Sequence, residues 1–198
     1  MTLQMRSSWS SLTGSSLHRV IDQLRSLSPA QWQAESLCEG WSIADVAGHL
    51  AWRLDPNTIR SAGIAIGTGA RAGLKVIDTI AHDEGRRSPA ALIEVLDAHA
   101  RVFVQGDCRD LRADLVEAVV HGFDAFPDGQ LEFSPSATWE CVRVSTPLLS
   151  GDYRALIKER TLVAADADWS VGTGPTFESS AREIVLAAYG RRTLDISA

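Results

Sequence analysis

Residues 110–124 contain the side chains in this sequence that are best suited to chemistry. If Asp-Leu-Arg-Ala-Asp-Leu-Val-Glu-Ala-Val-Val-His-Gly-Phe-Asp forms an α-helix, its polar residues share one stripe beside an apolar face: Asp114, Glu117, His121 and Asp124. A carboxylate and an imidazole at positions i and i+4 can bind a single metal ion. The same pair can also be a partly solvated interaction on an ordinary amphipathic helix. The metal-site interpretation therefore depends on a third ligand elsewhere in the chain.

His49 is the candidate for that third ligand. It lies on the shoulder of the apolar face of a predicted helix that begins after Ser42. In a helical bundle, two ligands on one helix and one on another can face the same interior point. A His/Glu/His set leaves a coordination position open, which is typical of a catalytic rather than a structural zinc site. If no such metal site exists, His49 is an ordinary core or surface residue and not a ligand.

The elements that would position these ligands are predicted from hydrophobic periodicity and capping residues. Ser42 with Asp45, and Ser28-Pro29 with Gln31, are typical of helix N-termini. Residues 61–73 are rich in Gly and Ala and are interpreted as a frayed helix end or loop, followed by a further helical piece from Leu74 to Ile80. Four main helices, at about 9–27, 42–54, 88–105 and 110–124, predict a four-helix bundle.

The pattern of apolar and polar residues changes near Gln130, and we place a domain boundary there. Residues 1–129 form the predicted metal-binding helical bundle, and residues 130–198 form a small α+β C-terminal domain. In the second part, Ser134-Pro135 predicts a helix start, 161–165 is a short apolar segment, and 170–175 is typical of a strand end and turn. A final helix from Ser180 to Tyr189 is expected to stop at Gly190. The fold class is therefore mainly α.

The composition limits the classes of partner and compartment. The chain has 198 residues, 45% hydrophobic and 22% charged, with a formal charge of −6 that argues against nucleic-acid and anionic-membrane partners. The cysteines, at 38, 108 and 141, show no CxxC spacing, as expected in a reducing compartment. The N-terminal residues do not predict a signal peptide, and no segment has the roughly 18 apolar residues that span a bilayer. We predict a soluble cytoplasmic protein.

Four segments carry a resemblance to a known family. Residues 36–51, Ser-Leu-Cys-Glu-Gly-Trp-Ser-Ile-Ala-Asp-Val-Ala-Gly-His-Leu-Ala, resemble the N-terminal signature of the mycothiol-dependent maleylpyruvate isomerase family. That family belongs to the DinB-like superfamily of metal-binding four-helix bundles. Residues 115–124, Leu-Val-Glu-Ala-Val-Val-His-Gly-Phe-Asp, look like its second signature, Glu-x-x-x-His followed by Asp. Residues 162–175 and 187–191 are similar to its small C-terminal domain.

The resemblance implies a site and a chemistry. His49, Glu117 and His121 would bind a divalent metal, zinc, and the open position would take the sulfur of mycothiol or a similar small thiol. Bonding to a divalent cation deprotonates a thiol, so the metal-bound thiolate would attack a small electrophilic substrate in isomerisation or S-transfer. Arg191 would bind an anionic substrate, with Arg192 as the alternative. Arg191 could equally be a cation that stabilises the C-terminus of its helix.

Two other functions use the same fold. A non-catalytic member would bind a metal, a ligand or a partner in the same pocket. A zinc-dependent hydrolase would need a general base, for which Asp124 is the nearby candidate. Asp45, Asp114 and Asp124 are expected either to orient the histidines or to cap and solvate their helices. Cys38 is predicted to be a small buried residue rather than a nucleophile.

Overall fold

The computed structural model describes residues 8–56, 70–128, 131–143 and 149–196. It divides into two compact units, Met1–Leu131 and Glu132–Ala198. In the described part of the chain, no helix is both long enough and apolar enough to cross a membrane.

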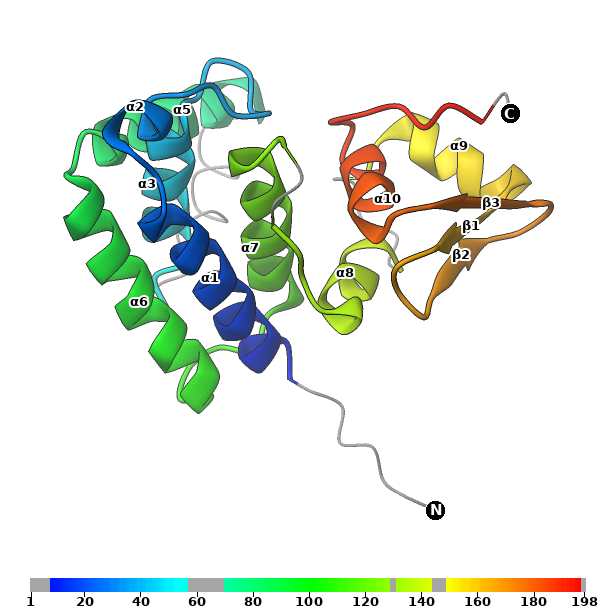
Figure 1. Cartoon of the computed structure of the whole chain (residues 1–198), viewed down its shortest axis with the longest axis horizontal. Helices are drawn as coiled ribbons and strands as arrows, with labels where there is room; N and C mark the ends of the chain where they lie inside the picture. Colours follow the sequence, from blue (N-terminus) through cyan, green and yellow to red (C-terminus); the bar gives the residue numbers. More distant parts are fainter. Residues whose placement is uncertain (1–7, 57–69, 129–130, 144–148, 197–198) are drawn as a thin grey trace. The chain divides into compact units, whose positions relative to one another are not determined.

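The first unit is a bundle of helices (Figure 1). Its helices are α1 (Trp9–Arg25), α2 (Pro29–Trp32), α3 (Ile43–Arg53), α5 (Ala70–Gly85), α6 (Pro89–Gln105) and α7 (Arg112–Ala125). Helix α1 packs against α6 and α7, and α3 packs against α5, α6 and α7. The four predicted main helices are therefore present and pack together, which confirms the predicted fold of this unit.

Local capping explains where the helix that carries His49 begins. The Ser42 hydroxyl accepts a hydrogen bond from the backbone N–H of Asp45, and the Asp45 carboxylate accepts one from the N–H of Ser42 at 2.8 Å. Ser28 and Gln31 form the same reciprocal arrangement at the start of α2. Each pair satisfies N–H groups that the first helical turn leaves without partners, so both predicted helix starts are confirmed.

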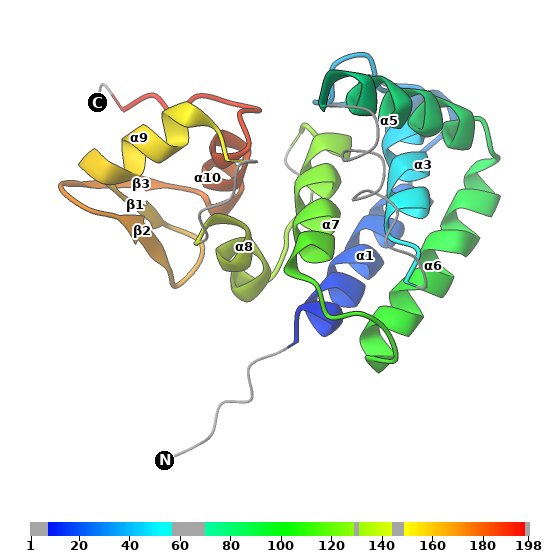
Figure 2. The same ribbon diagram turned by 180° about the vertical axis from the view of Figure 1, so that it is seen from behind.

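Helix α5 is longer than the predicted helical piece and lies beside α3 (Figure 2). The predicted loop over 61–73 lies outside the described residues up to position 69, and 70–73 belong to the first turn of α5. Two glycines allow α3 and α5 to approach closely. A Cβ atom on Gly48 would lie 2.5 Å from the backbone nitrogen of Gly85. This close backbone contact fixes α3 immediately before His49.

Leucine and phenylalanine side chains fill the interior of the bundle. Each main helix contributes fully buried members, including Leu17, Leu50, Leu96, Phe103, Leu115 and Phe123. Burial of such side chains stabilises the fold by roughly 1.5–3 kcal/mol each relative to exposure. The polar groups of the candidate site are thus held by a well-filled apolar core.

The second unit combines helices with a small sheet. It contains α8 (Pro135–Val142), α9 (Gly151–Glu159), β1 (Thr161–Ala164), β2 (Ser170–Gly172), β3 (Thr176–Ser179) and α10 (Ala181–Ala188). The strand order is β2-β1-β3, with β1 antiparallel to β2 and parallel to β3. Helix α10 packs against α8, α9 and β1. This confirms the predicted small α+β fold, although α9 and β3 were not predicted.

Two tyrosines tie the end of α8 to the rest of the second unit. The Tyr153 hydroxyl donates to the carbonyl of Val142 at 3.3 Å, and the Tyr189 hydroxyl donates to the carbonyl of Cys141 at 2.9 Å. These carbonyls belong to the last turn of α8, where intrahelical donors run out. The predicted stop of the final helix at Gly190 agrees with its positive φ of 71°.

Candidate functional site

The three predicted ligands lie together in the bundle. His49 projects from α3, while Glu117 and His121 are one turn apart on α7. The Nε2 atoms of His49 and His121 lie 3.2 Å and 3.4 Å from Oε2 of Glu117. One donor atom from each residue lies within 4.8 Å of the others. Neighbouring ligands of a tetrahedral zinc ion are about 3.3–3.6 Å apart, given bonds of about 2.0–2.3 Å, so this spacing fits one ion.

The nature of the donors also fits a divalent cation. Two imidazole nitrogens and one carboxylate oxygen form a set that zinc accepts, and His49 is only 4% exposed. A His/Glu/His set provides three protein ligands and leaves room for a fourth from a small molecule. The arrangement can therefore hold a metal with an open coordination position.

An ion-pair network that the sequence did not reveal holds the second oxygen of Glu117. Nε of Arg53, in the last turn of α3, lies 3.3 Å from Oε1 of Glu117. The same arginine donates from Nη1 to Asp114 at 3.0 Å, and Arg109 donates from Nε to Asp114 at 2.7 Å. Asp114 is fully buried, and the two guanidinium groups compensate its charge. Asp114 is therefore connected to the site through Arg53 rather than through a histidine.

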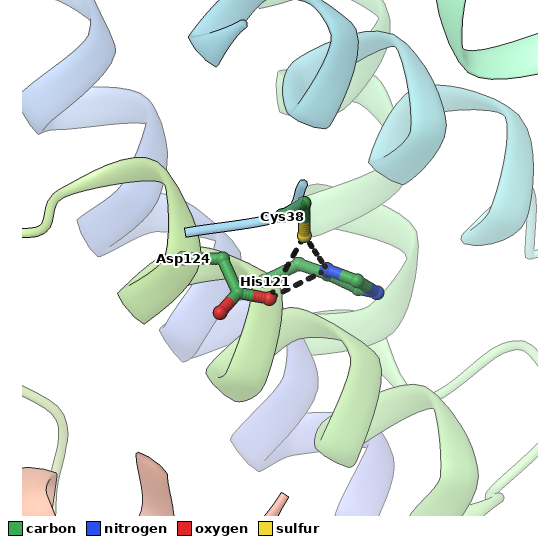
Figure 3. Close-up of side chains that lie close together, drawn as sticks. All are labelled: Cys38, His121 and Asp124. Atoms are coloured by element: carbon green, nitrogen blue, oxygen red, sulfur yellow. Dashed lines mark hydrogen bonds and ion pairs between the residues drawn. The ribbon is translucent and has the colours of Figure 1, made fainter. Parts of the chain in front are cut away.

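The other nitrogen of His121 is bonded to Asp124. Nδ1 of His121 lies 3.0 Å from Oδ2 of Asp124, whose carboxylate is fully buried (Figure 3). Such a carboxylate fixes the orientation of a metal-binding imidazole. Because Asp124 is buried and already bonded, it is poorly placed to act as the general base of a hydrolase.

Cys38 is the second group that the sequence did not connect to the site. Its thiol donates to Oδ2 of Asp124 at 3.2 Å and lies 3.5 Å from Nδ1 of His121 (Figure 3). The side chain is half-buried, so the prediction of a small buried residue misses its contact with a histidine. The contact depends on a backbone hydrogen bond from Leu37 N to Asp124 O, 2.9 Å long, between residues far apart in sequence. No local pattern around Cys38 reveals this contact.

Asp45, the remaining aspartate of interest, contacts a different histidine. Its carboxylate caps α3 through Ser42 and lies 3.2 Å from Nδ1 of His82. The structure therefore gives Asp45 the capping role that the sequence offered as one of two possibilities.

Trp41 covers the two histidines of the site. Its ring centroid lies 5.1 Å from that of His49 and 6.0 Å from that of His121, and the tryptophan is 8% exposed. Its indole N–H donates to Asp78 at 3.2 Å, which fixes the ring. This indole shields the histidine rings from water on one side.

The protonation of the site follows from burial and from these contacts. Burial lowers the pKa of His49, and its hydrogen bond with Glu117 offsets only part of that effect. Burial alone would raise the pKa of Glu117, but hydrogen bonds from His121 and His49 hold it well below its usual value. Burial likewise opposes charge on His121, yet its hydrogen bonds, first with Asp124 and then with Cys38, raise its pKa well above the usual value. These contacts therefore favour the protonated form of His121 more than that of His49.

Arg191 lies in the second unit, directly after α10. Its backbone N–H donates to Leu186 O at 2.8 Å, and its guanidinium Nη1 donates to Tyr189 O at 3.1 Å. The side chain is half-buried. The contact with a carbonyl at the helix C-terminus is what the helix-stabilising interpretation of this arginine expects.

Comparison with known proteins connects this geometry to a family. A family model described as the mycothiol maleylpyruvate isomerase N-terminal domain matches residues 14–126, more than half of the chain. Two crystal structures share the fold, those of the mycothiol-dependent maleylpyruvate isomerase and of a histidine-to-alanine mutant of it, with TM-scores of 0.55 and 0.56. Both are 14% identical to this chain, and the alignments cover 93% of this chain and 88% of the other. No curated protein sequence matches significantly. The chain thus belongs to the mycothiol maleylpyruvate isomerase N-terminal domain family, as its two signature segments predicted.

Proposed function

We propose that this protein is a metal-dependent isomerase that uses mycothiol, or a similar small thiol, to act on a small electrophilic substrate. Membership in the family, and the fold shared with an isomerase, support an enzyme of this kind. The observation that carries the metal part of the proposal is the grouping of His49, Glu117 and His121 within 4.8 Å. A non-catalytic binding protein of the same fold is the alternative that the experiments below separate.

In this proposal, His49 Nε2, Glu117 Oε2 and His121 Nε2 hold a divalent cation, and we propose zinc. When bound, the cation would lower the pKa of a thiol and so supply a thiolate nucleophile at neutral pH. Asp124 holds the proton on Nδ1 of His121 and thereby directs Nε2 toward Glu117. Arg53 holds Oε1 of Glu117, which leaves Oε2 as its ligand atom.

Substrate binding is the proposed task of the second unit. An arginine can bind a carboxylate through two parallel hydrogen bonds, and we propose Arg191 for this role. We also propose that the two compact units correspond to the metal-binding and C-terminal domains predicted at 1–129 and 130–198. The three free cysteines are compatible with the proposed cytoplasmic location.

Metal analysis tests the ligand set directly. Purified protein reconstituted with zinc should hold one ion in the His/Glu/His site, and His49→Ala or His121→Ala should lose it. His82→Ala is the matched control, because His82 pairs with Asp45 instead. A protein that takes up no metal under zinc-replete conditions refutes the metal-dependent mechanism.

Turnover separates the isomerase from the binding protein. Zinc-loaded protein should isomerise maleylpyruvate only when mycothiol is present, and Glu117→Ala should abolish this activity. Arg191→Met should raise KM more than it lowers kcat, whereas Arg192→Met, one residue further from the helix, should change neither by much. Metal binding without thiol-dependent turnover would favour the non-catalytic alternative.

A further inference from the structure

The Nδ1 side of His121 carries a donor set of its own. Sγ of Cys38, Nδ1 of His121 and Oδ2 of Asp124 form a compact triangle (Figure 3). Its sides measure 3.5 Å between sulfur and nitrogen, 3.2 Å between sulfur and oxygen, and 3.0 Å between nitrogen and oxygen. Sulfur, imidazole nitrogen and carboxylate oxygen are the three ligand types that zinc takes in proteins.

The size of the triangle suits a bound cation. Tetrahedral zinc with bonds of about 2.0 Å to oxygen and nitrogen and about 2.3 Å to sulfur separates its ligands by about 3.3–3.6 Å. The observed sides are equal to or a few tenths of an ångström shorter than that range, so the side chains need only small movements. The carboxylate of Asp124 is fully buried, and a cation would take the place of the two protons that Cys38 and His121 direct at this carboxylate.

The backbone holds these donors in place without a metal. Leu37 N donates to the carbonyl of Asp124 at 2.9 Å, which joins the turn formed by residues 36–41 to the end of α7. Within the turn, Cys38 N donates to the Ser36 hydroxyl at 3.1 Å, and Trp41 N donates to the carbonyl of Cys38 at 3.0 Å. The sulfur is therefore positioned by a hydrogen-bonded turn rather than by a flexible loop.

We propose that Cys38, His121 and Asp124 form a second divalent-cation site, which adjoins the His49–Glu117–His121 site and shares the imidazole of His121. A cation entering this site forms bonds to Sγ, Nδ1 and Oδ2, and the protons of the thiol and of Nδ1 pass to solvent. When both sites are filled, His121 has given up both ring protons to solvent, and its imidazolate bridges the two cations. The proposal shares His121 with the proposed function but does not depend on thiol-dependent turnover.

Titration with Co²⁺ tests the second site, because a cysteine ligand to cobalt gives a thiolate-to-metal charge-transfer band in the near ultraviolet. The wild-type protein should bind two equivalents of Co²⁺ and develop this band. Cys38→Ser should bind one equivalent and lose the band. Cys108→Ser is the matched control and should keep it, since the thiol of Cys108 lies near Ser10 and Val102 O instead.

His49→Ala separates this proposal from the proposed function. This variant should lose the equivalent bound by the first site and retain the charge-transfer band, whereas Cys38→Ser should show the opposite pattern. If Cys38→Ser does not fold, alkylation of the wild-type protein decides: zinc should protect Cys38, and not Cys108, from iodoacetamide. Binding without a charge-transfer band, a band that persists in Cys38→Ser, or equal alkylation of Cys38 with and without zinc overturns the second site.

Discussion

Replacing Gly48 with alanine should destabilise the bundle, although alanine is the better helix former. A Cβ atom at this position would lie 2.5 Å from Gly85 N and 2.8 Å from the carbonyl carbon of Glu84. Both atoms are backbone, so no side-chain rotation relieves the contact and α5 must move away from α3. Overpacking of this kind costs about 1–3 kcal/mol, and we expect the upper part of that range. The higher helix propensity of alanine offsets about 1 kcal/mol of this cost, so the free energy of unfolding should fall by about 1–2 kcal/mol.

Urea denaturation of Gly48→Ala measures this loss, with Gly151→Ala as the matched control. Gly151 is also a helical glycine, the first residue of α9, but a Cβ atom there would have no atom within 4 Å. Its substitution should change the free energy of unfolding by less than about 0.5 kcal/mol. A Gly48→Ala protein as stable as the wild type would refute the argument that backbone contact sets the α3–α5 spacing.

The same substitution should weaken metal binding. Gly48 precedes His49, so a displacement of α3 moves one proposed ligand while Glu117 and His121 stay together on α7. Competition with a chromophoric chelator should therefore show lower zinc affinity for Gly48→Ala and unchanged affinity for Gly151→Ala. Equal affinities for both variants would mean that α5 does not position the ligand.

Three further predictions concern metal, charge and pH. Zinc at a hundredfold excess over the Kd of the His49–Glu117–His121 site should raise the free energy of unfolding in thermal denaturation by about 2.7 kcal/mol through that site, and Glu117→Ala should lose this part of the gain. Arg109→Met should destabilise the protein by about 3 kcal/mol, because Asp114 is fully buried, yet metal analysis should find the His/Glu/His site still loaded. Burial raises the pKa of Tyr153. Above pH 10 the tyrosine therefore loses its proton in the unfolded state and keeps it in the folded state. The free energy of unfolding should fall there by up to about 1.4 kcal/mol per pH unit. Denaturation at pH 9 and pH 11 should show this component in the wild type and not in Tyr153→Phe; identical pH dependence in both would contradict it.

Features that depend on neighbouring residues were predicted well from the sequence. The capping pairs at Ser28 and Ser42, the four main helices and the stop at Gly190 each rest on signals within a few residues. The grouping of His49 with the α7 residues rests on a longer-range assumption, that a bundle brings two polar shoulders together. The structure places these side chains together, and their role as metal ligands is the proposal that metal analysis tests.

Other features that depend on distant residues were not predicted. Cys38 lies beside His121 because the backbone hydrogen bond from Leu37 N to Asp124 O joins its turn to α7. No sequence pattern indicates that hydrogen bond. Arg53 is 6% exposed, against the usual preference of arginine for the surface, because Asp114 and Glu117 compensate its charge from another helix. Helix α9 and strand β3 carry many exposed polar positions and owe their structure to packing within a small unit.

The division of the proposed ligands between α7 and α3 has a consequence for the order of assembly. Glu117 and His121 are one helical turn apart, so their relative position is established as soon as α7 is helical. His49 joins them only when α3 docks. An arriving ion can thus engage a preformed pair first and be enclosed by the third ligand later, which makes escape of the ion depend on local opening of one helix. The exchange rate of bound metal would then measure how often the contact between α3 and α7 opens locally.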